Sequence, residues 1–136
     1  MAAVPEGLEG LRIYQLAEEL ADAVWDEVLR WSPFPRDTLG QQLVDAADSV
    51  GGNIAEGYGR YHYRDNRQFQ YYARGSLFET RHWLRRAHKR ALLSNDRFTE
   101  LAARVEALAP QLNAYIRTLG RRSKSGSTKT QSPEET

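Results

Sequence analysis

The amphipathic helical periodicity of this sequence restricts its possible folds more than any other feature. In four stretches, apolar residues recur every three or four positions, and no stretch alternates apolar and polar residues as a half-buried strand does. An amphipathic helix buries its apolar face against another element. We therefore expect an all-α protein whose four helices form an antiparallel up-down-up-down bundle.

The first two expected helices are separated by a proline-containing segment. The first helix places Ile13, Ala17 and Leu20 on one face. The segment SPFPRD, residues 32–37, is expected to end this helix, because proline disrupts a helix interior. Asp37 or a neighbour is then predicted to cap the second helix, whose apolar positions run to Ile54.

The last two expected helices are longer. The third extends from about Tyr63 to about Leu93, and any of the residues Ser94 to Asp96 can cap the fourth. Pro110 lies inside the fourth helix, where it removes one hydrogen bond and is expected to kink the helix. Gly120 is predicted to end it.

The 136 residues suffice for one domain with a hydrophobic core. We expect a flexible N-terminus at residues 1–10, the bundle at residues 11–120 and a disordered polar tail without apolar anchors at residues 121–136. The sequence contains no cysteine, no apolar run long enough to cross a bilayer and no signal-peptide pattern, so a cytoplasmic location is expected.

Charge is distributed unevenly along the chain. Residues 1–59 contain eleven acidic and three basic residues. Residues 60–90 contain nine basic and two acidic residues, together with all three histidines. This asymmetry predicts either an anionic partner or electrostatically matched subunit surfaces.

Most of these basic residues share one face of the third helix with the aromatic residues Tyr71 and Phe78, within about 120° of arc at 100° per residue. This basic stripe, the candidate nucleic-acid-binding set, consists of Arg60, Arg64, Arg67, Tyr71, Arg74, Arg81, Arg85, His88 and Lys89. The opposite arc is predicted to face the core and holds Phe69, Ala73, Ser76, Thr80, Trp83, Leu84 and Ala87. Cations interleaved with aromatic rings suit phosphate binding with base stacking.

Two other interpretations of the basic stripe remain open. Arginines can simply solvate the outer face of a helix, although such faces usually mix opposite charges at i, i+4 and this helix has few acidic residues. The stripe can also pair with the acidic first helix of a neighbouring subunit, which would make the protein a purely structural oligomeric adaptor.

No catalytic or metal-binding pattern in the sequence is complete. Glu79 and His82 have the Glu-x-x-His spacing of di-iron carboxylate sites, but no second copy of the pattern occurs. Gly75 and Ser76 are not part of a Gly-x-Ser-x-Gly elbow, and the glycines at residues 51–59 lack the Lys-Ser/Thr of a phosphate-binding loop. We expect a protein without enzymatic activity, cofactor or metal.

Two motifs carry a resemblance to a known family. Residues 46–57 follow the pattern Ala-x-x-Ser-x-x-x-Asn-Ile-Ala-Glu-Gly, and residues 69–79 follow Phe-x-x-x-Ala-x-Gly-Ser-x-x-Glu. The motif residues singled out are Asn53, Glu56, Gly57, Gly75, Ser76 and Glu79. From about Leu11 to about Leu119, the chain resembles the four-helix-bundle proteins encoded within intervening sequences of bacterial large-subunit ribosomal RNA genes.

The resemblance implies a four-helix bundle that assembles as a ring-shaped homopentamer and associates with nucleic acid. A distant branch of the family, the accessory proteins of diversity-generating retroelements, implies a reverse transcriptase and its RNA as partners. Asp45 stands where the family usually has an arginine, and Gly51 where it commonly has a proline. We therefore place the expected contact with RNA, DNA or a ribonucleoprotein on the third helix.

The glycines of the first motif predict local structure. Gly51 and Gly52 lie inside the second helix, where glycine is unfavourable, so another backbone is expected to approach closely there. Glycines 57 and 59 are expected to supply the turn into the third helix. Glu56 is expected to pair with Arg60, and Asn53 to bond to backbone near the turn.

Overall fold

The computed structural model of the chain describes residues 6–125, and four long helices account for most of them. These helices are α1 (Arg12–Val28), α3 (Gln41–Tyr58), α4 (Tyr63–Lys89) and α5 (Asn95–Lys124). Three short helical segments complete the described chain: η1 (Gly7–Gly10), α2 (Pro33–Pro35) and η2 (Arg36–Gly40). No strand occurs within residues 6–125, so the all-α prediction is confirmed for this part of the chain.

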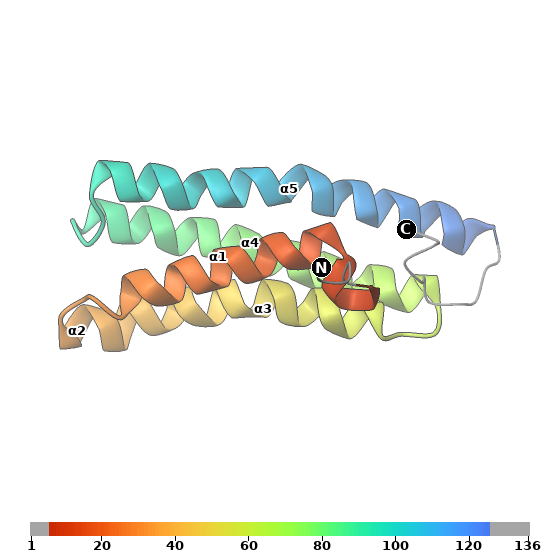
Figure 1. Cartoon of the computed structure of the whole chain (residues 1–136), viewed down its shortest axis with the longest axis horizontal. Coiled ribbons are helices and arrows are strands. Elements are labelled where there is room, and N and C mark those ends of the chain that lie inside the picture. The colour runs from red at the N-terminus through yellow and green to blue at the C-terminus, as the bar shows by residue number, and fades with distance from the viewer. Residues whose placement is uncertain (1–5, 126–136) are drawn as a thin grey trace, which may run out of the picture.

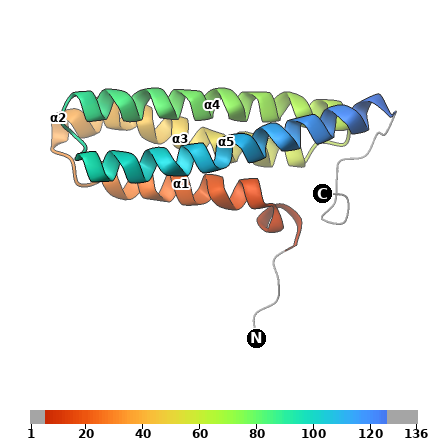
Figure 2. The same cartoon turned by 90° about the horizontal axis from the view of Figure 1, so that it is seen from above.

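The long helices lie side by side along the long axis of the molecule (Figure 1). The α1–α3 and α4–α5 connections lie at one end, and the α3–α4 connection lies at the other. Seen from above, α4 and α1 lie on opposite sides of α5 (Figure 2). The most extensive contact joins α3 to α4, and α5 packs against both α4 and α1.

The predicted cap at Asp37 is wrong, because the second helical region begins four residues earlier. Ser32 has an extended backbone, and Pro33 occupies the first helical turn, where its missing N–H breaks no helical bond. The prolines therefore start the next helix as well as separating it from α1. Helical backbone then continues from α2 through η2, a π-helical turn, into α3.

A Schellman motif ends α4 at Lys89, earlier than the predicted limit near Leu93. Ala91 has a left-handed φ of 62°, and the Leu92 N–H donates to the Ala87 carbonyl at 2.9 Å. The predicted cap of the following helix is confirmed, since the Ser94 hydroxyl accepts a hydrogen bond from the Arg97 N–H at 3.1 Å.

The predicted end of the last helix at Gly120 is wrong. The helix α5 contains Pro110 and continues to Lys124. Gly120 is buried in this helix, where an added Cβ would lie 3.0 Å from the guanidinium carbon of Arg67. Helical structure at residues 7–10 and 121–124 likewise departs from the expected flexible N-terminus and disordered tail. Residues 1–5 and 126–136 lie outside the described residues.

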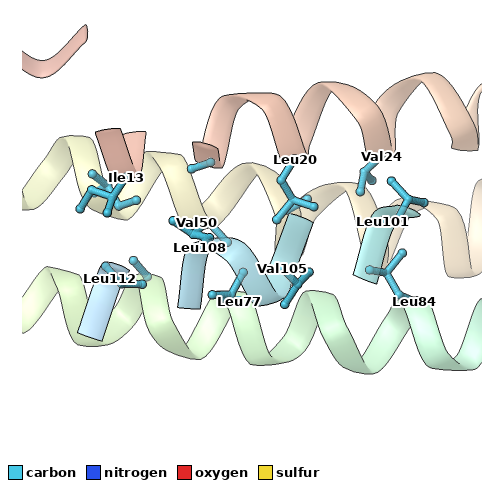
Figure 3. Packing of buried hydrophobic residues seen from close by; sticks show 14 of the residues in the cluster. Ile13, Leu20, Val24, Val50, Leu77, Leu84, Leu101, Val105, Leu108 and Leu112 are labelled. Atoms are coloured by element: carbon cyan, nitrogen blue, oxygen red, sulfur yellow. The ribbon is translucent and has the colours of Figure 1, made fainter. Parts of the chain in front are cut away.

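The core consists of aliphatic side chains from all four long helices. Figure 3 shows Leu20 of α1, Val50 of α3, Leu84 of α4 and Leu108 of α5 directed toward one another. Each of these side chains is at most 1% exposed. Removing this apolar surface from water drives the packing of the helices, at about 25 cal/mol for each Å² buried.

The core-facing side of α4 is rotated relative to the prediction. The residues it buries recur at alternating intervals of three and four: Tyr63, Asn66, Gln70, Ala73, Leu77, Thr80, Leu84 and Ala87. The predicted core residues Phe69, Ser76 and Trp83 are only half-buried. Hydropathy missed the true face because Asn66 and Gln70 are polar residues in the core, and each is 0% exposed.

A polar layer, formed by Asn66, Gln70 and Tyr115, joins α4 to α3 and α5 within this core. Gln70 Nε2 donates to Asn66 Oδ1 at 2.8 Å and to the Ile54 carbonyl at 3.2 Å. Asn66 Nδ2 donates to the Tyr115 hydroxyl at 3.2 Å. Burial raises the pKa of Tyr115 above its usual value of 10.0, so this hydroxyl stays protonated in the folded protein near neutral pH.

Candidate functional site

The rotation of α4 divides the basic stripe into an inner row and an outer row. The inner row, which adjoins α5, consists of Arg67, Arg74, Arg81 and His88. The outer row, farther from α5, consists of Arg64, Arg85 and Lys89, all of which are exposed. Arg60 precedes α4 and is exposed as well.

Every member of the inner row contacts a residue of α5. The Arg74 guanidinium donates to Asn113 Oδ1 at 3.3 Å, and Arg81 forms an ion pair with Glu106 at 2.8 Å. His88 Nε2 lies 2.7 Å from Asn95 Oδ1. The Arg67 side chain lies against Gly120. The inner row therefore helps to attach α5 to α4.

The aromatic residues near the N-terminal half of the stripe are already covered by cations of the same chain. The guanidinium carbons of Arg67 and Arg74 lie 5.3 and 4.9 Å from the centre of the Tyr71 ring. Arg60 lies 4.6 Å from the Phe69 ring and also pairs with Glu56 at 2.7 Å. The expected Glu56–Arg60 pair is thus present.

The outer row differs from the inner row, because its cations form no ion pair within residues 6–125. Within residues 6–125, no carboxylate lies within ion-pair distance of Arg64, Arg85 or Lys89. Arg86, which the sequence prediction left out of the stripe, is also without an ion pair in this part of the chain. These cations can therefore bind an anion without first breaking an intramolecular salt bridge.

An open groove lies at the C-terminal end of the stripe and has a volume of about 820 Å³. Its walls are formed by Phe78, Arg81, His82, Arg85, Arg86, His88, Lys89 and Phe98. The His88 ring stacks on Phe98 with ring centres 4.3 Å apart. The sequence did not predict that His82 and Phe98 line a common groove, because neither periodicity nor motif spacing reveals a groove between two helices.

The motif residues occupy structural positions. An added Cβ on Gly57 would lie 2.6 Å from both Asn66 Oδ1 and Gln70 Nε2, so the polar layer requires glycine there. Glu79 accepts a hydrogen bond from the Trp83 indole at 3.2 Å. Asn53 bonds to the Ser49 carbonyl inside α3, whereas a bond near the turn was expected. Ser76 accepts a bond from the Thr80 hydroxyl through its carbonyl.

Gly75 has open space around it, since an added Cβ would meet no heavy atom within 4 Å. No other part of residues 6–125 therefore approaches closely at Gly75.

The opposite side of the molecule is acidic, where α1 and α3 meet. Burial raises the pKa of Asp48, and the charges of Asp45 and Asp22 raise it further. A shallow groove of about 230 Å³ here is lined by Tyr14, Ala17, Glu18, Ala21, Asp22, Asp48, Gly51, Gly52 and Ala55. The molecule thus carries opposite charges on separate faces.

No metal centre or membrane span emerges from the described part of the chain. Residues 6–125 contain no group of three or more His, Cys, Asp or Glu side chains placed to hold a metal ion. None of their helices is long and apolar enough to cross a membrane.

Fold and surface together define a class of protein: residues 6–125 are mostly helical, with a core shared by four long helices and a row of exposed cations on one of them. Residues 9–114 match the family described as 23S rRNA-intervening sequence protein. The chain belongs to this family.

A solved structure agrees with this assignment at the level of the fold. It is the crystal structure of a protein with unknown function from the S23 ribosomal protein family of Bacteroides thetaiotaomicron. The two chains share 17% sequence identity and a TM-score of 0.70, over 76% of this chain and 97% of that chain. No curated protein matches the sequence.

Proposed function

We propose that the protein is a non-enzymatic, homo-oligomeric helical bundle that binds RNA or DNA through the basic face of α4. The observation that carries this proposal is the outer row, in which Arg64, Arg85 and Lys89 are exposed and have no ion pair within residues 6–125. Phosphate groups of nucleic acid suit such a row, because each phosphate neutralised releases condensed counterions.

The same surface suits nucleic acid that arrives within a larger complex. A ribonucleoprotein, or a reverse transcriptase with its RNA, presents the same phosphate groups as free nucleic acid. The support for a reverse transcriptase as partner is the resemblance of the sequence motifs to a family of which retroelement accessory proteins would be a distant branch. The cytoplasm is the compartment in which we expect such a complex.

The proposed assembly is an antiparallel up-down-up-down bundle repeated in a ring of about five subunits, as closed cyclic symmetry allows. Family membership supports the bundle, and the motif resemblance supports the ring. A ring repeats the outer row around the assembly, so several weak interactions with phosphate would act together.

Salt-dependent binding tests the function. We expect a labelled oligonucleotide to bind at low ionic strength and to weaken with salt, with a log–log slope of about −0.7 per phosphate neutralised on single strands and about −0.9 on duplex DNA. Replacing Arg64, Arg85 and Lys89 by Glu should abolish this binding, since the cations that contact phosphate would be reversed.

A matched control reverses Arg117, Arg121 and Lys124 to Glu, because these exposed cations belong to α5 and lie outside the outer row of α4. This control changes the net charge equally and should bind nearly as wild type. Equal loss of binding in both variants would show a general charge effect and would contradict the proposal. The inner row is unsuitable for the test, because Arg74 and Arg81 contact α5.

The alternative function is a purely structural oligomeric adaptor, in which the basic stripe mates with the acidic face of a neighbouring subunit. The crowding of Asp48 with Asp45 and Asp22 favours it, since burial and, after it, these two negative charges raise the pKa of Asp48. Under this alternative, the Arg64, Arg85 and Lys89 reversal would dissociate the oligomer.

A further inference from the structure

The cations of α4 are not equally available along its length, and the groove at its C-terminal end concentrates those that are. Arg85, Arg86 and Lys89 line the groove without an ion pair in the described part of the chain. Glu106 pairs with Arg81 and with no other cation of the groove within residues 6–125. The groove therefore carries an excess of positive charge.

Helix stabilisation alone does not account for this arrangement. Basic residues in the last turn of a helix, such as Arg86 and Lys89, interact favourably with the negative end of the helix dipole. The effect falls off within the last turn. Arg81 and Arg85 lie farther back along α4 and line the same groove.

The groove also offers an aromatic ring that remains accessible. Phe78 is 57% exposed, although the Arg81 guanidinium lies 5.1 Å from its ring centre. In contrast, Tyr71 is half-buried and contacted by both Arg67 and Arg74. A planar ligand can therefore stack at the C-terminal end of the stripe and not at Tyr71.

On the side of the groove near α5, contacts between His88 of α4 and residues of α5 hold the two helices together. His88 stacks on Phe98 with nearly parallel rings, at an angle of 8°, and bonds to Asn95. The two sides of the groove are thereby tied together across the α4–α5 connection. Such preorganisation lowers the entropy lost when a ligand binds.

From these contacts we infer that the groove binds single-stranded nucleic acid, with phosphates on Arg85, Arg86 and Lys89 and an unstacked base on Phe78. This inference rests on the proposed function and narrows it to one site and one form of nucleic acid. Arg85 and Lys89 lie four residues apart, or about 6 Å along the helix, so they can follow a phosphate backbone. Bases in a duplex are stacked on one another, whereas a single strand can present the face of a base to an aromatic ring.

The size of the groove agrees with such a ligand. Its volume of about 820 Å³ falls within the range of small-molecule sites, about 300–1,000 Å³, so one or two nucleotides fit while the rest of the strand continues outside. A free nucleotide has the same chemistry as one unit of the strand, so the experiment must separate the two.

The test measures the affinity of the full chain for a labelled single-stranded RNA, with matched duplex RNA and a mononucleotide as competitors. Phe78→Ala should weaken single-strand binding by at least about five-fold, the lower end of base-stacking effects. Tyr72→Ala is the matched control, because Tyr72 is a 50% exposed aromatic residue on α4 outside the groove. It should bind as wild type.

A charge variant completes the test. Replacing Arg85, Arg86 and Lys89 by Gln should weaken binding about ten-fold or more, and the salt slope should fall by about 0.7 for each phosphate of the single strand that is no longer neutralised. Circular dichroism checks that the helices remain intact. If this variant does not fold, Phe78→Ala and the competition data still decide the question.

Three results would overturn the inference while leaving the proposed function standing. They are duplex RNA that competes as well as the single strand, a Phe78→Ala variant that binds as wild type, and equal competition by the mononucleotide at the same molar concentration. If the wild-type chain binds no nucleic acid at low salt, both the inference and the proposed function fail.

Discussion

At the scale of single residues, Gly57 is the position where the structure most clearly demands glycine. An added Cβ would lie 2.6 Å from the side chains of Asn66 and Gln70 and 2.8 Å from the Asn66 carbonyl. We predict that Gly57→Ala destabilises the protein by about 1–3 kcal/mol, because overpacking forces side chains or backbone to shift. Urea denaturation measures this change.

Gly52 provides the control for that substitution. No heavy atom lies within 4 Å of a Cβ placed there, and the residue is exposed in α3. Gly52→Ala should therefore stabilise the helix by up to about 1 kcal/mol, the difference in helix propensity. Loss of stability at Gly52, or none at Gly57, would contradict this account of the two glycines.

The two adjacent glycines Gly51 and Gly52 led to a wrong prediction of where another part of the chain approaches α3 closely. An added Cβ on Gly51 would make only ordinary contacts, 3.7 Å from the Ala17 Cβ. The close approach occurs at Gly57, because the partner there is an amide pair on the next helix. Sequence spacing within α3 contains no information about that partner.

The Tyr115 hydroxyl predicts loss of stability in alkali. Burial raises the pKa of Tyr115 in the folded protein above its unfolded value of 10.0. The stabilising effect is fully present below pH 10 and is lost as the pH rises toward the folded pKa, because the unfolded chain then releases the proton first. Urea midpoints measured from about pH 8 to about pH 11 should fall more steeply in wild type than in Tyr115→Phe.

The phenylalanine variant also tests the polar layer near neutral pH. Asn66 Nδ2 would lose the acceptor that it has at 3.2 Å, which should cost about 1 kcal/mol. If wild type and variant lost stability equally with rising pH, the titration of Tyr115 would not be the cause.

At the scale of elements, an ion pair between the buried Glu27 and the partly buried Arg97 joins α1 to α5. Glu27 is 8% exposed, and its carboxylate accepts from Arg97 at 2.8 Å and from the Trp31 indole at 2.9 Å. Arg97→Ala should destabilise the protein by about 3 kcal/mol, because it leaves the buried Glu27 charge without its cation. Thermal or urea unfolding measures the change.

The exposed pair Arg36–Asp37 is the control for this prediction, since the two side chains are 42% and 64% exposed. Arg36→Ala should cost less than about 1 kcal/mol. Replacing Glu27 and Arg97 together by apolar residues should recover most of the stability lost in Arg97→Ala. No recovery in the double variant would mean that packing, rather than charge, is responsible.

The sequence was enough to predict four long α-helices, but not the residues at which they begin and end or the faces that they bury. Long amphipathic stretches give a strong periodic signal, and Ser94 caps α5 as predicted. Pro33 was misjudged because a proline that separates one helix from the next can also begin the next. The face of α4 was misjudged because the amides of Asn66 and Gln70 donate hydrogen bonds inside the core to partners far away in sequence.

The sequence predicted which basic residues share a face of α4. It did not predict which of these residues remain available at the surface. Helical spacing brought the cations of α4 together, but it could not separate Arg74, which bonds to Asn113, from Arg85, which has no ion pair within residues 6–125. That separation depends on α5, whose contacts become visible only in three dimensions.

At the scale of the whole molecule, the dependence of the oligomer mass on salt distinguishes the proposed assembly from one in which oppositely charged faces of neighbouring subunits pair. We expect an oligomer of about five 15.5-kDa chains whose mass, measured by light scattering after gel filtration, stays constant as NaCl increases. Salt screens interactions between exposed charges, so it has little effect on an interface that is stabilised mainly by burial of apolar surface. A mass that falls toward one chain at high salt would instead favour the adaptor, and monomer at every salt concentration would contradict the assembly.

The buried amides of Asn66 and Gln70 also affect the outside of the molecule. A purely apolar seam tolerates alternative registers of one helix against its neighbours, whereas a displaced amide would lose its hydrogen bonds and remain buried. Each residue of slippage turns a helix by about 100°. Any register that separates Gln70 from the Ile54 carbonyl would therefore redirect Arg64 and Arg85 as well. Two uncharged side chains in the interior fix the direction in which the surface cations face.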